Sequence, residues 1–410
     1  MSAHLRRIID FGPGAGAFPG SANDYRFHDN RAYVAETGTT WIRLWADWPS
    51  LQPDPAIAID AAENPGLPWL QALDDQIATA CADGVRVMLV AHRFPVWANG
   101  TAELAAVRNT DAEASFAFAD RIAPATWNRY VAAGRDPAVF NPGRRALEYR
   151  VPPEGLGPGS AWAGFFAFLY GRYALDIADP ARCAHGFDLV NEPNYFLWPQ
   201  REPGPDDAPF SARTPVAVTG PVAQLIGAAQ AVAEGVGGRS LLFAPSAADS
   251  EVRTRIVTHF DEFAAALLDA LEAAAIQVGP RVAWAHHNYS DLERRWDTTY
   301  LQQLRDVLRG RWTGYEEGEP PTVFVTEGGA RLSKMRALYP AEDPLAAQAE
   351  SLRQGWDRHV RDDGPGAGVA MLAQYQTYSD PRFDTGLLDP WPSTVRRPAY
   401  DVWASLPRFP

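Results

Sequence analysis

Eight short apolar segments recur along the chain, and a helical pattern separates most of them from the next. Every segment is rich in Val, Ile, Leu, Met or Phe, as strands buried on both faces must be. Buried strands that alternate with helices predict a parallel sheet, because each crossover returns the chain to the same edge. The predicted strands are Arg7–Phe11, Thr40–Leu44, Val85–Ala91, Gly186–Val190, Ser240–Ala244, Val282–Ala285, Thr322–Thr326 and Val369–Ala373.

Amphipathic or alanine-rich stretches fill the intervals between these strands. Eight strand–helix units, a closing helix and no break in composition favour an α/β fold, a (β/α)₈ TIM barrel that spans residues 1–410 as a single domain. A doubly wound open sheet is the alternative. The predicted helices are Asn30–Glu36, Pro68–Asp83, Ala161–Ile177, Pro221–Glu234, Phe260–Ala275, Leu301–Leu308, Ala346–Val360 and Pro398–Leu406.

Two connections are far longer than usual loops from strand to helix. The first is an insertion at residues 97–159, after the third strand, and the second covers residues 194–220, after the fourth. The insertion is rich in Pro, Gly, Arg and aromatic residues, which predicts a packed lid or pocket wall. In a barrel both connections lie at the carboxyl ends of the strands, where the active sites of this fold are found.

Charge and cysteine content narrow the classes of partner and location. With 37 basic and 50 acidic residues the formal net charge is −13, which disfavours nucleic acid and anionic membrane surfaces as partners. Two cysteines make no disulfide framework. Residues 1–11 lack the apolar stretch of a secretory signal, and no segment approaches the ~20 apolar residues of a membrane span, so we expect a cytoplasmic protein.

Two glutamates follow buried strands at the end where a barrel carries its chemistry. The fourth strand ends in 188–193 (DLVNEP) and the seventh in 323–329 (VFVTEGG), so Glu192 and Glu327 are both expected at the barrel mouth. Cleavage of a glycosidic bond needs such a pair, one carboxyl group to protonate the leaving oxygen and one carboxylate to attack the anomeric carbon. The alternative is a pair of solvated loop glutamates, which the apolar runs before both residues disfavour.

Basic and polar side chains end two other predicted strands. The second strand ends in 41–45 (WIRLW), and Arg43 there is expected to hold a nucleophilic Glu327 ionised by lowering its pKa. The third strand ends in 91–93 (AHR), which places His92 at the same rim. An imidazole at this position can bind hydroxyl groups or orient a carboxylate.

The sixth strand ends in 285–289 (AHHNY), where His287 and Tyr289 share one face at strand spacing. We expect both to face the barrel mouth. His286 lies between them on the opposite face and is interpreted as a structural residue that points away.

Together these strand ends resemble clan A of the glycoside hydrolases, and within it most closely family 5, the cellulase-like family. That family carries Arg at the second strand, His at the third, Asn-Glu at the fourth, His-x-Tyr at the sixth and Glu at the seventh. The resemblance covers essentially the whole barrel and implies a retaining double displacement, with Glu192 as acid/base, Glu327 as nucleophile and Asn191 on the sugar 2-hydroxyl. The matching residues are Arg43, His92, Asn191, Glu192, His287, Tyr289 and Glu327.

The chain departs from the family pattern at two positions. The family's tryptophan platform at the end of the eighth strand is missing, since residues 371–376 read MLAQYQ, and Gly328 stands where an aromatic residue commonly follows the nucleophile. Another side chain must then contact the first sugar or stack on it. The candidates are Gln374, Tyr375, Trp45, Trp97 and Trp198.

Other enzyme classes find little support in the sequence. Residues 12–17 (GPGAGA) match a dinucleotide-binding fingerprint, but Pro19 and Gly20 follow where a helix should begin. The sequence has no helical His-Glu-x-x-His, no cluster of Cys or His at ligand spacing and no Gly-x-Ser-x-Gly elbow. We therefore expect neither a cofactor nor a metal ion.

The substrate class stays open at this point. An exo-acting β-glycosidase on small glycosides or disaccharide conjugates fits a cytoplasmic enzyme and a mouth narrowed by the insertion at 97–159. An endo-acting β-glucanase or β-mannanase is the second interpretation, and a non-catalytic carbohydrate-binding barrel is a third, from another class. The oligomeric state is not predicted.

Overall fold

The eight strands close into one parallel barrel in the computed structural model, which describes residues 6–11, 27–99, 151–152, 155–176, 182–195, 198, 218–249, 257–295, 298–316, 321–360, 368–379 and 383–406. The order around the barrel is the order along the chain, and β1 pairs with β8 in parallel. This confirms the predicted (β/α)₈ fold and excludes the open sheet. The strands are β1 (Arg6–Asp10), β2 (Trp41–Asp47), β3 (Arg86–His92), β4 (Ala184–Asp188), β5 (Leu241–Ala248), β6 (Val282–His287), β7 (Val323–Glu327) and β8 (Val369–Tyr375).

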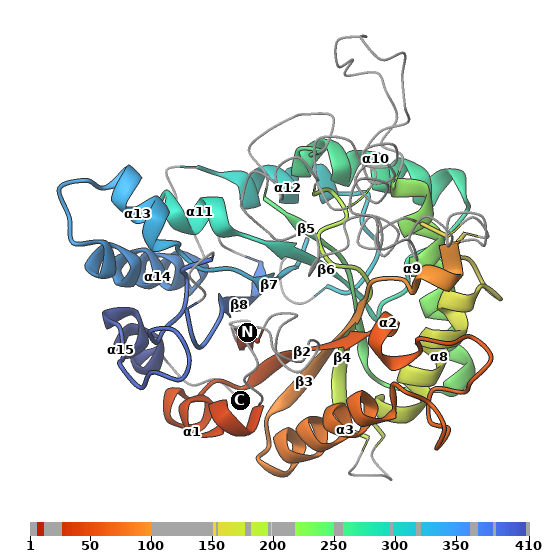
Figure 1. The fold of residues 1–410 in the computed structure, drawn as a ribbon. Coiled ribbons are helices and arrows are strands. Elements are labelled where there is room, and N and C mark those ends of the chain that lie inside the picture. The colour runs from red at the N-terminus through yellow and green to blue at the C-terminus, as the bar shows by residue number, and fades with distance from the viewer. Residues whose placement is uncertain are drawn as a thin grey trace, which may run out of the picture.

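Helices surround the strands, as Figure 1 shows, and cover the outer face of the barrel with their apolar sides. All eight predicted helices are present, and three short ones, α2, α11 and α13, were not expected. The helices are α1 (Phe27–Thr37), α2 (Trp48–Leu51), α3 (Leu67–Ala82), α8 (Ala161–Tyr173), α9 (Thr219–Val236), α10 (Phe260–Ala273), α11 (Tyr289–Glu293), α12 (Tyr300–Leu308), α13 (Leu332–Leu338), α14 (Pro344–Val360) and α15 (Pro398–Ser405).

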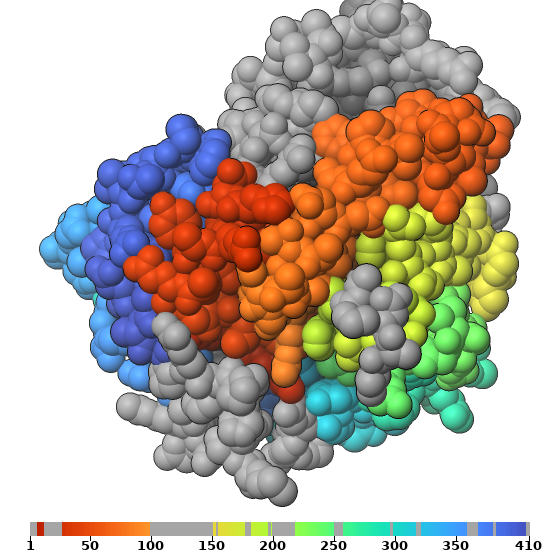
Figure 2. All heavy atoms as spheres, turned by 90° about the horizontal axis from the view of Figure 1, so that it is seen from below, coloured from red at the N-terminus to blue at the C-terminus, as the bar shows by residue number. Residues whose placement is uncertain are grey.

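Closure of the barrel brings the first and the last described elements together. Helix α1 packs between α3 and the closing helix α15. The space-filling view in Figure 2 shows the red N-terminal elements between the blue C-terminal elements and the orange segments that follow them. Buried Arg7 on β1 reinforces this seam, because its guanidinium donates to the backbone carbonyl groups of Trp403 and Gly38.

Most of the two long connections lies outside the described residues. Of the insertion at 97–159, the structure describes 97–99, at the end of a 3₁₀ helix (Val96–Asn99), and 151–152 and 155–159. Of residues 194–220 it describes 194–195, 198 and 218–220. Most of the predicted lid and the whole dinucleotide-like segment 12–17 therefore lie outside the described residues.

A disulfide joins the two cysteines. Cys81, in the last turn of α3, is bonded to Cys183, just before β4, with the two Cα atoms 6.2 Å apart and 102 positions apart in sequence. Two cysteines so distant in the sequence do not predict a bond to each other, because only the barrel places α3 against the start of β4. The bond lies toward the amino ends of the strands, away from the predicted chemistry.

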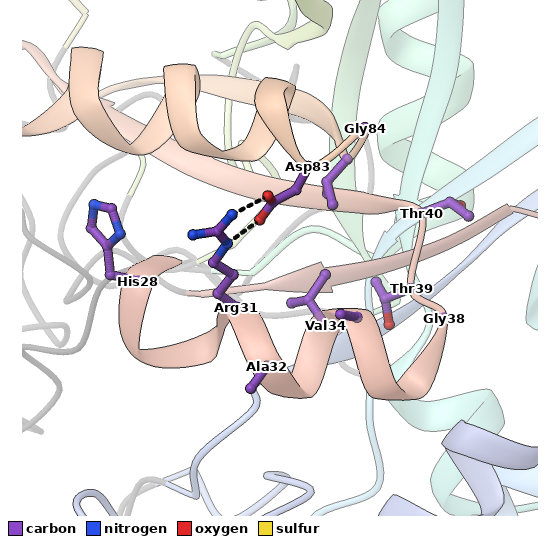
Figure 3. A pocket seen from close by; sticks show the side chains of 11 residues that line it. His28, Arg31, Ala32, Val34, Gly38, Thr39, Thr40, Asp83 and Gly84 are labelled. Atoms are coloured by element: carbon purple, nitrogen blue, oxygen red, sulfur yellow. Dashed lines mark hydrogen bonds and ion pairs between the residues drawn. The ribbon is translucent and has the colours of Figure 1, made fainter.

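A hollow of about 930 Å³ opens at the amino-terminal end of β2 and β3, beside α1. Figure 3 shows Arg31 of α1 reaching across it to the carboxylate of Asp83, which follows α3. His28 is likewise paired, with Asp75 at 2.7 Å. Arg31 and Asp83 thus pair within the hollow and His28 pairs with a residue outside its lining, and none of the predicted site residues lines it. Among the described residues, no helix is both long and apolar enough to cross a membrane.

Candidate active site

Glu192 and Glu327 both lie at the carboxyl-terminal mouth of the barrel. Glu327 is the last residue of β7, and Glu192 stands four positions beyond β4. The turn that carries Glu192 is held to the neighbouring strand, since its backbone N–H donates to the carbonyl of Ser246 at 3.1 Å. The side chains are 19% and 9% exposed, respectively. Both carboxyl groups are therefore accessible from the mouth but largely shielded from water.

His287, at the end of β6, lies between the two glutamates. Its Nδ1 is 3.1 Å from Oε1 of Glu192 and 3.7 Å from Oε2 of Glu327. One imidazole nitrogen of His287 and one carboxylate oxygen from each glutamate all lie within 4.8 Å of one another. Burial lowers the pKa of His287, but the two carboxylates raise it more, so that its net pKa is above the ordinary value. This imidazole is positioned to share protons with both glutamates.

Two donors hold the Glu327 carboxyl group from opposite sides. Nη1 of Arg43 donates to Oε2 at 2.8 Å, and the hydroxyl of Tyr289 donates to Oε1 at 2.6 Å. Tyr289 is buried, and desolvation together with the charge of Glu327 raises its pKa well above the ordinary value, so the phenol stays a donor. These contacts fix the orientation of Glu327 in the mouth.

Arg43 uses all five N–H donors of its guanidinium. Nε and Nη2 donate to Asp188 at 3.1 and 2.7 Å, Nη2 also donates to Oδ1 of Asn191 at 2.7 Å, and Nη1 donates to Asp10 and Glu327. The arginine is fully buried, so its position is set by these acceptors. It joins β2 to four residues, which lie on β1, on β4, in the turn after β4 and on β7.

The proton affinity of Glu327 differs from the expectation. Arg43 and His287 do lower its pKa, but burial, with the charges of Asp10 and Glu192, raises it more, and the net result is a pKa of about 7. The reason is that one arginine shared among three carboxylates cannot offset the loss of water around Glu327. The sequence predicts the contact of Arg43 with Glu327 but not Asp10 and Asp188, the two other carboxylates that share the arginine.

The side chains of Glu192, His287 and Glu327 are close enough to one another to share a cation. Both oxygens of Glu327 already accept hydrogen bonds, however, and the guanidinium charge of Arg43 beside them repels a metal ion. The donor set fits a pair of carboxyl groups that exchange protons through an imidazole better than it fits a metal centre.

Trp45 and His92 extend the cluster on the side of β2 and β3. Trp45 packs against the guanidinium of Arg43, with its ring centroid 4.7 Å from the guanidinium carbon, and its indole N–H donates to Asp10 at 2.9 Å. His92 packs edge-on against Trp45 at 4.6 Å and lies 3.2 Å from Asp47. Both predicted residues are thus in contact with the core of the site.

At β8 the structure separates the two predicted sugar contacts. Gln374 is buried, and its amide donates to the backbone carbonyls of Tyr375 and Thr385, so it serves the barrel wall. Tyr375 is half-buried and meets the ring of Tyr289 at 6.4 Å and that of Phe383 at 5.3 Å. Tyr375 therefore belongs to the aromatic side of the site, and Phe383 joins it without having been predicted.

The two other tryptophans predicted to stack on a sugar, Trp97 and Trp198, pack against the protein itself. Trp97 donates its indole N–H to the carbonyl of Gln52 and packs edge-on against Trp48. Trp198 is buried against Phe94 and donates to the carbonyl of Asn191. Neither is placed as an open stacking platform, although Trp198 supports the segment that carries Asn191 and Glu192.

His286 points away from the mouth as expected. It is fully buried against Phe260 of α10, and desolvation lowers its pKa to about 3, so it stays neutral.

Two buried acids of the cluster were not predicted. Asp10 ends β1 and Asp188 ends β4, and neither side chain is exposed. Asp188 also accepts the hydroxyl of Ser246 at 2.7 Å. Asp188 lies inside the DLVNEP segment, three positions before Asn191, and Asp10 interrupts an apolar strand. In the sequence each is therefore visible as a carboxylate within a run of buried residues.

The presence of glycine at position 328 has a steric explanation. A Cβ atom at this position would collide with the side-chain Oδ1 of Asn288 and approach the carbonyl of Ala373 at 3.4 Å. Asn288 is fully buried and directly precedes Tyr289, while Gly328 directly follows Glu327. Only glycine leaves room for this contact between the end of β6 and the end of β7.

We expect Gly328→Ala to lower the free energy of unfolding by about 1–3 kcal/mol through overpacking, and to reduce any activity by about tenfold to a hundredfold because Glu327 is displaced. Urea unfolding measures the first effect. Adding Asn288→Ala should restore part of the loss. Gly164→Ala, in α8 where a Cβ meets nothing within 4 Å, is the matched control and should not destabilise the protein. Equal effects of the two glycine variants would contradict the steric explanation.

Comparisons with known proteins show which solved structures share this fold. No protein-family model matches the chain, and no curated protein matches its sequence. Among solved structures, it is similar to endo-glycoceramidase II from Rhodococcus sp. in a five-membered iminocyclitol complex, with 14% identity, 98% of this chain and 78% of that chain covered, and a TM-score of 0.52.

Two further solved structures are similar to this chain to about the same degree. One is a GH5-4 broad specificity endoglucanase from Clostridium acetobutylicum, at 14% identity and a TM-score of 0.51, covering 98% of this chain and 96% of that one. The other is a family 39 glycoside hydrolase from Bacteroides cellulosilyticus WH2, at 12% identity and a TM-score of 0.51, covering 98% and 63%. At these identities the comparisons show the shared barrel fold.

Proposed function

We propose that the protein is a retaining glycoside hydrolase of clan A that cleaves β-glycosidic bonds, with Glu192 as acid/base and Glu327 as nucleophile. Membership of family 5 is part of this proposal, as is the treatment of residues 1–410 as one catalytic domain. The observation that carries it is the distance between the two glutamates: their nearest oxygens lie within 4.8 Å of each other. Retaining glycosidases keep their carboxyl groups about 5–5.5 Å apart, whereas inverting enzymes leave about 6.5–9.5 Å for a water molecule.

The first step assigns a role to each contact of Glu192 and Glu327. Glu327, oriented by Arg43 and Tyr289, attacks the anomeric carbon and forms a glycosyl-enzyme while the bond to the leaving group breaks. Glu192 gives its proton to the leaving oxygen. The Nδ1 atom of His287 lies 3.1 Å from Glu192 and can donate a hydrogen bond to the carboxylate that this step leaves.

In the second step Glu192, now ionised, removes a proton from water, and the resulting hydroxide displaces Glu327 from the anomeric carbon. The sugar leaves with its original configuration. Arg43 and Tyr289 then again hold the released carboxylate. Asn191, fixed by Arg43 at 2.7 Å, is placed to hold the sugar 2-hydroxyl, where hydrogen bonds strengthen in the transition state.

For the substrate we propose a small β-glycoside or a disaccharide conjugate. One of the similar structures is a lactosyl-enzyme intermediate of the Rhodococcus endo-glycoceramidase II, which is a covalent disaccharide adduct on the same fold. The half-buried Tyr375 and Phe383 beside Tyr289 offer aromatic surface for a sugar or aglycone. An endo-acting enzyme on β-glucan or mannan is the second candidate, favoured by the endoglucanase among the similar structures.

A panel of substrates tests the proposal. p-Nitrophenyl β-glucoside, β-galactoside, β-mannoside, β-cellobioside and β-lactoside are compared with β-glucan and mannan, using the wild type, Glu192→Ala and Glu327→Gly. Cleavage of a small glycoside that needs both glutamates supports the exo-acting or disaccharide-releasing enzyme. Cleavage of polymer alone moves the proposal to the endo-acting candidate. Binding without cleavage of any substrate would contradict it in favour of a non-catalytic barrel.

The pKa of Glu327 predicts the acidic limb of the pH profile. A protonated Glu327 cannot attack, so kcat/KM for the free enzyme should rise with pH through about 7. The measurement is kcat/KM for the best p-nitrophenyl glycoside at constant ionic strength between pH 4 and pH 10. A limb at the ordinary glutamate value of about 4.3 would show that burial does not dominate the site.

A further inference from the structure

Asp10, the last residue of β1, is the least expected member of the site. Its side chain is fully buried, and it accepts hydrogen bonds from Nη1 of Arg43 and from the indole of Trp45 at 2.9 Å. Neither the resemblance to family 5 nor the strand-end pattern gives this aspartate a role. Of its two partners, Arg43 bonds Glu327 directly, and Trp45 packs against the guanidinium of Arg43.

Asp10 and Glu327 are bonded to the same nitrogen atom. The two N–H bonds of Nη1 point one to each carboxylate, with 2.8 Å to Oε2 of Glu327. Asp188 is bonded instead to Nε and Nη2, on the other side of the guanidinium. Asp10 is therefore the buried acid that competes with Glu327 at the closest range.

Positive charge is scarce around Glu327. Arg43 from β2 and His287 from β6 are its cationic neighbours among the described residues, and His287 is cationic only when protonated. Tyr289 of α11 donates a neutral hydroxyl, and Tyr375 of β8 packs behind it. The acidic side chains gathered here are Asp10 of β1, Asp188 of β4 and Glu192 after β4.

We propose that Asp10 is a positioning residue for the reaction: it holds Arg43 and Trp45 in the arrangement that presents Arg43 to Glu327, and it withholds part of the arginine charge from Glu327. The inference rests on the proposed function. Its consequence is that the nucleophile stays a stronger proton acceptor than the contact with Arg43 alone would leave it, in agreement with the upward effect of Asp10 on the pKa of Glu327. A stronger proton acceptor is also a stronger nucleophile toward carbon.

The test is Asp10→Asn, which keeps the shape and removes the charge. The acidic limb of kcat/KM should move to lower pH by about one unit, since Arg43 then acts on Glu327 with less competition. At the optimum kcat should fall by about tenfold, because the nucleophile is weaker and Arg43 is less firmly held. A residue with only a structural role would lower activity without moving the limb.

Asp188→Asn is the matched control, because it neutralises an equally buried partner of Arg43 on the far side from Glu327. Its limb should move by less than about a third of the shift seen for Asp10→Asn. Trp45→Phe is a second variant in case Asp10→Asn does not fold. It leaves the charge of Asp10 without the indole donor and should move the limb upward by a few tenths of a unit.

A second readout needs no activity. A glutamate whose pKa is raised in the folded state makes the protein less stable as pH rises. For Glu327 this loss runs from about pH 4.3, the unfolded pKa, to about 7, the folded pKa. The unfolding free energy of Glu327→Gln relative to its parent should therefore rise over this window. In an Asp10→Asn background the rise should end about one pH unit lower.

The two readouts separate this inference from the proposed function. If no glycoside is cleaved but the stability window shifts, the proposed function fails and the effect of Asp10 on Glu327 stands. If glycosides are cleaved but neither the limb nor the window moves in Asp10→Asn, Asp10 is only a core anchor and the inference is overturned. Where Asp10→Asn does not fold, an unmoved limb in Trp45→Phe overturns it as well.

Discussion

Glu327→Gly is expected to abolish turnover, with a loss of kcat of about 10⁴-fold or more, as removal of a catalytic nucleophile generally produces. The fold should survive the change. Glu327 is a buried acid with a raised pKa, so its ionised form costs stability, and Arg43 keeps Asp10, Asp188 and Asn191 as acceptors. Thermal unfolding and kcat on the best glycoside measure the two effects.

Added azide distinguishes a missing nucleophile from a damaged site. In Glu327→Gly azide can occupy the space of the lost carboxylate and attack from the same side, giving an α-glycosyl azide from a β-glycoside. In Glu192→Ala it should intercept the glycosyl-enzyme and give the β-azide. Glu63→Gly, an exposed glutamate before α3, is the matched control and should keep wild-type activity. Activity of Glu327→Gly within tenfold of wild type would show that another residue attacks.

Loss of the disulfide is the second large effect that we expect. Cys81→Ser with Cys183→Ser should lower the free energy of unfolding by about 3–5 kcal/mol, since a cross-link that closes a loop of about 100 residues restricts the unfolded chain by that order. The 102-residue separation spans β3, the insertion at 97–159 and α8. Urea unfolding of the double variant and of the wild type, with and without reductant, provides the measurement.

The controls for the disulfide use the same chain. Either single serine variant should match the double variant in stability, because one sulfur cannot form the bond, and reductant should destabilise only the wild type. Activity at low temperature should not change, since the bond lies toward the amino ends of the strands. Two free thiols in the unreduced, unfolded wild type, together with equal stabilities, would contradict the bond.

The disulfide also bears on location. Structural disulfides persist in oxidising compartments and are rare in a reducing cytoplasm. The Cys81–Cys183 bond therefore counts against the cytoplasmic location that the sequence analysis predicts. Thiol labelling of the protein in fractionated source cells distinguishes the two.

The eight strands could be predicted because each is apolar on both faces, and their order followed from the alternation with helices. Their carboxyl ends could not be predicted well. Strand β2 continues through Trp45 to Asp47, and β5 through Ser246 to Ala248, where polar or small residues replace the apolar run. Helix α11 was missed because its five residues are too few to show a helical period.

The placement of Glu192, Glu327 and their neighbours at the barrel mouth could be predicted, because their residue types recur at strand ends, where a barrel must gather them. Asp10 and Asp188 are visible in the sequence as carboxylates in buried runs, but their role was not predicted, because the partner that compensates them, Arg43, comes from a different strand. Trp97 and Trp198 are predicted as stacking residues from their type and their position in the sequence. Their indole groups bind backbone carbonyls, which no sequence pattern reveals.

The measurement that tests the central claim most directly is trapping of the covalent intermediate. The wild type is incubated with the 2-deoxy-2-fluoro β-glycoside of its best substrate, carrying a dinitrophenolate leaving group, and is then analysed by intact mass and peptide mapping. A mass increase of one fluoroglycosyl group on the peptide that contains Glu327 is the predicted result. A label on another residue, or turnover of the parent glycoside with inverted configuration and no label, would contradict the retaining mechanism.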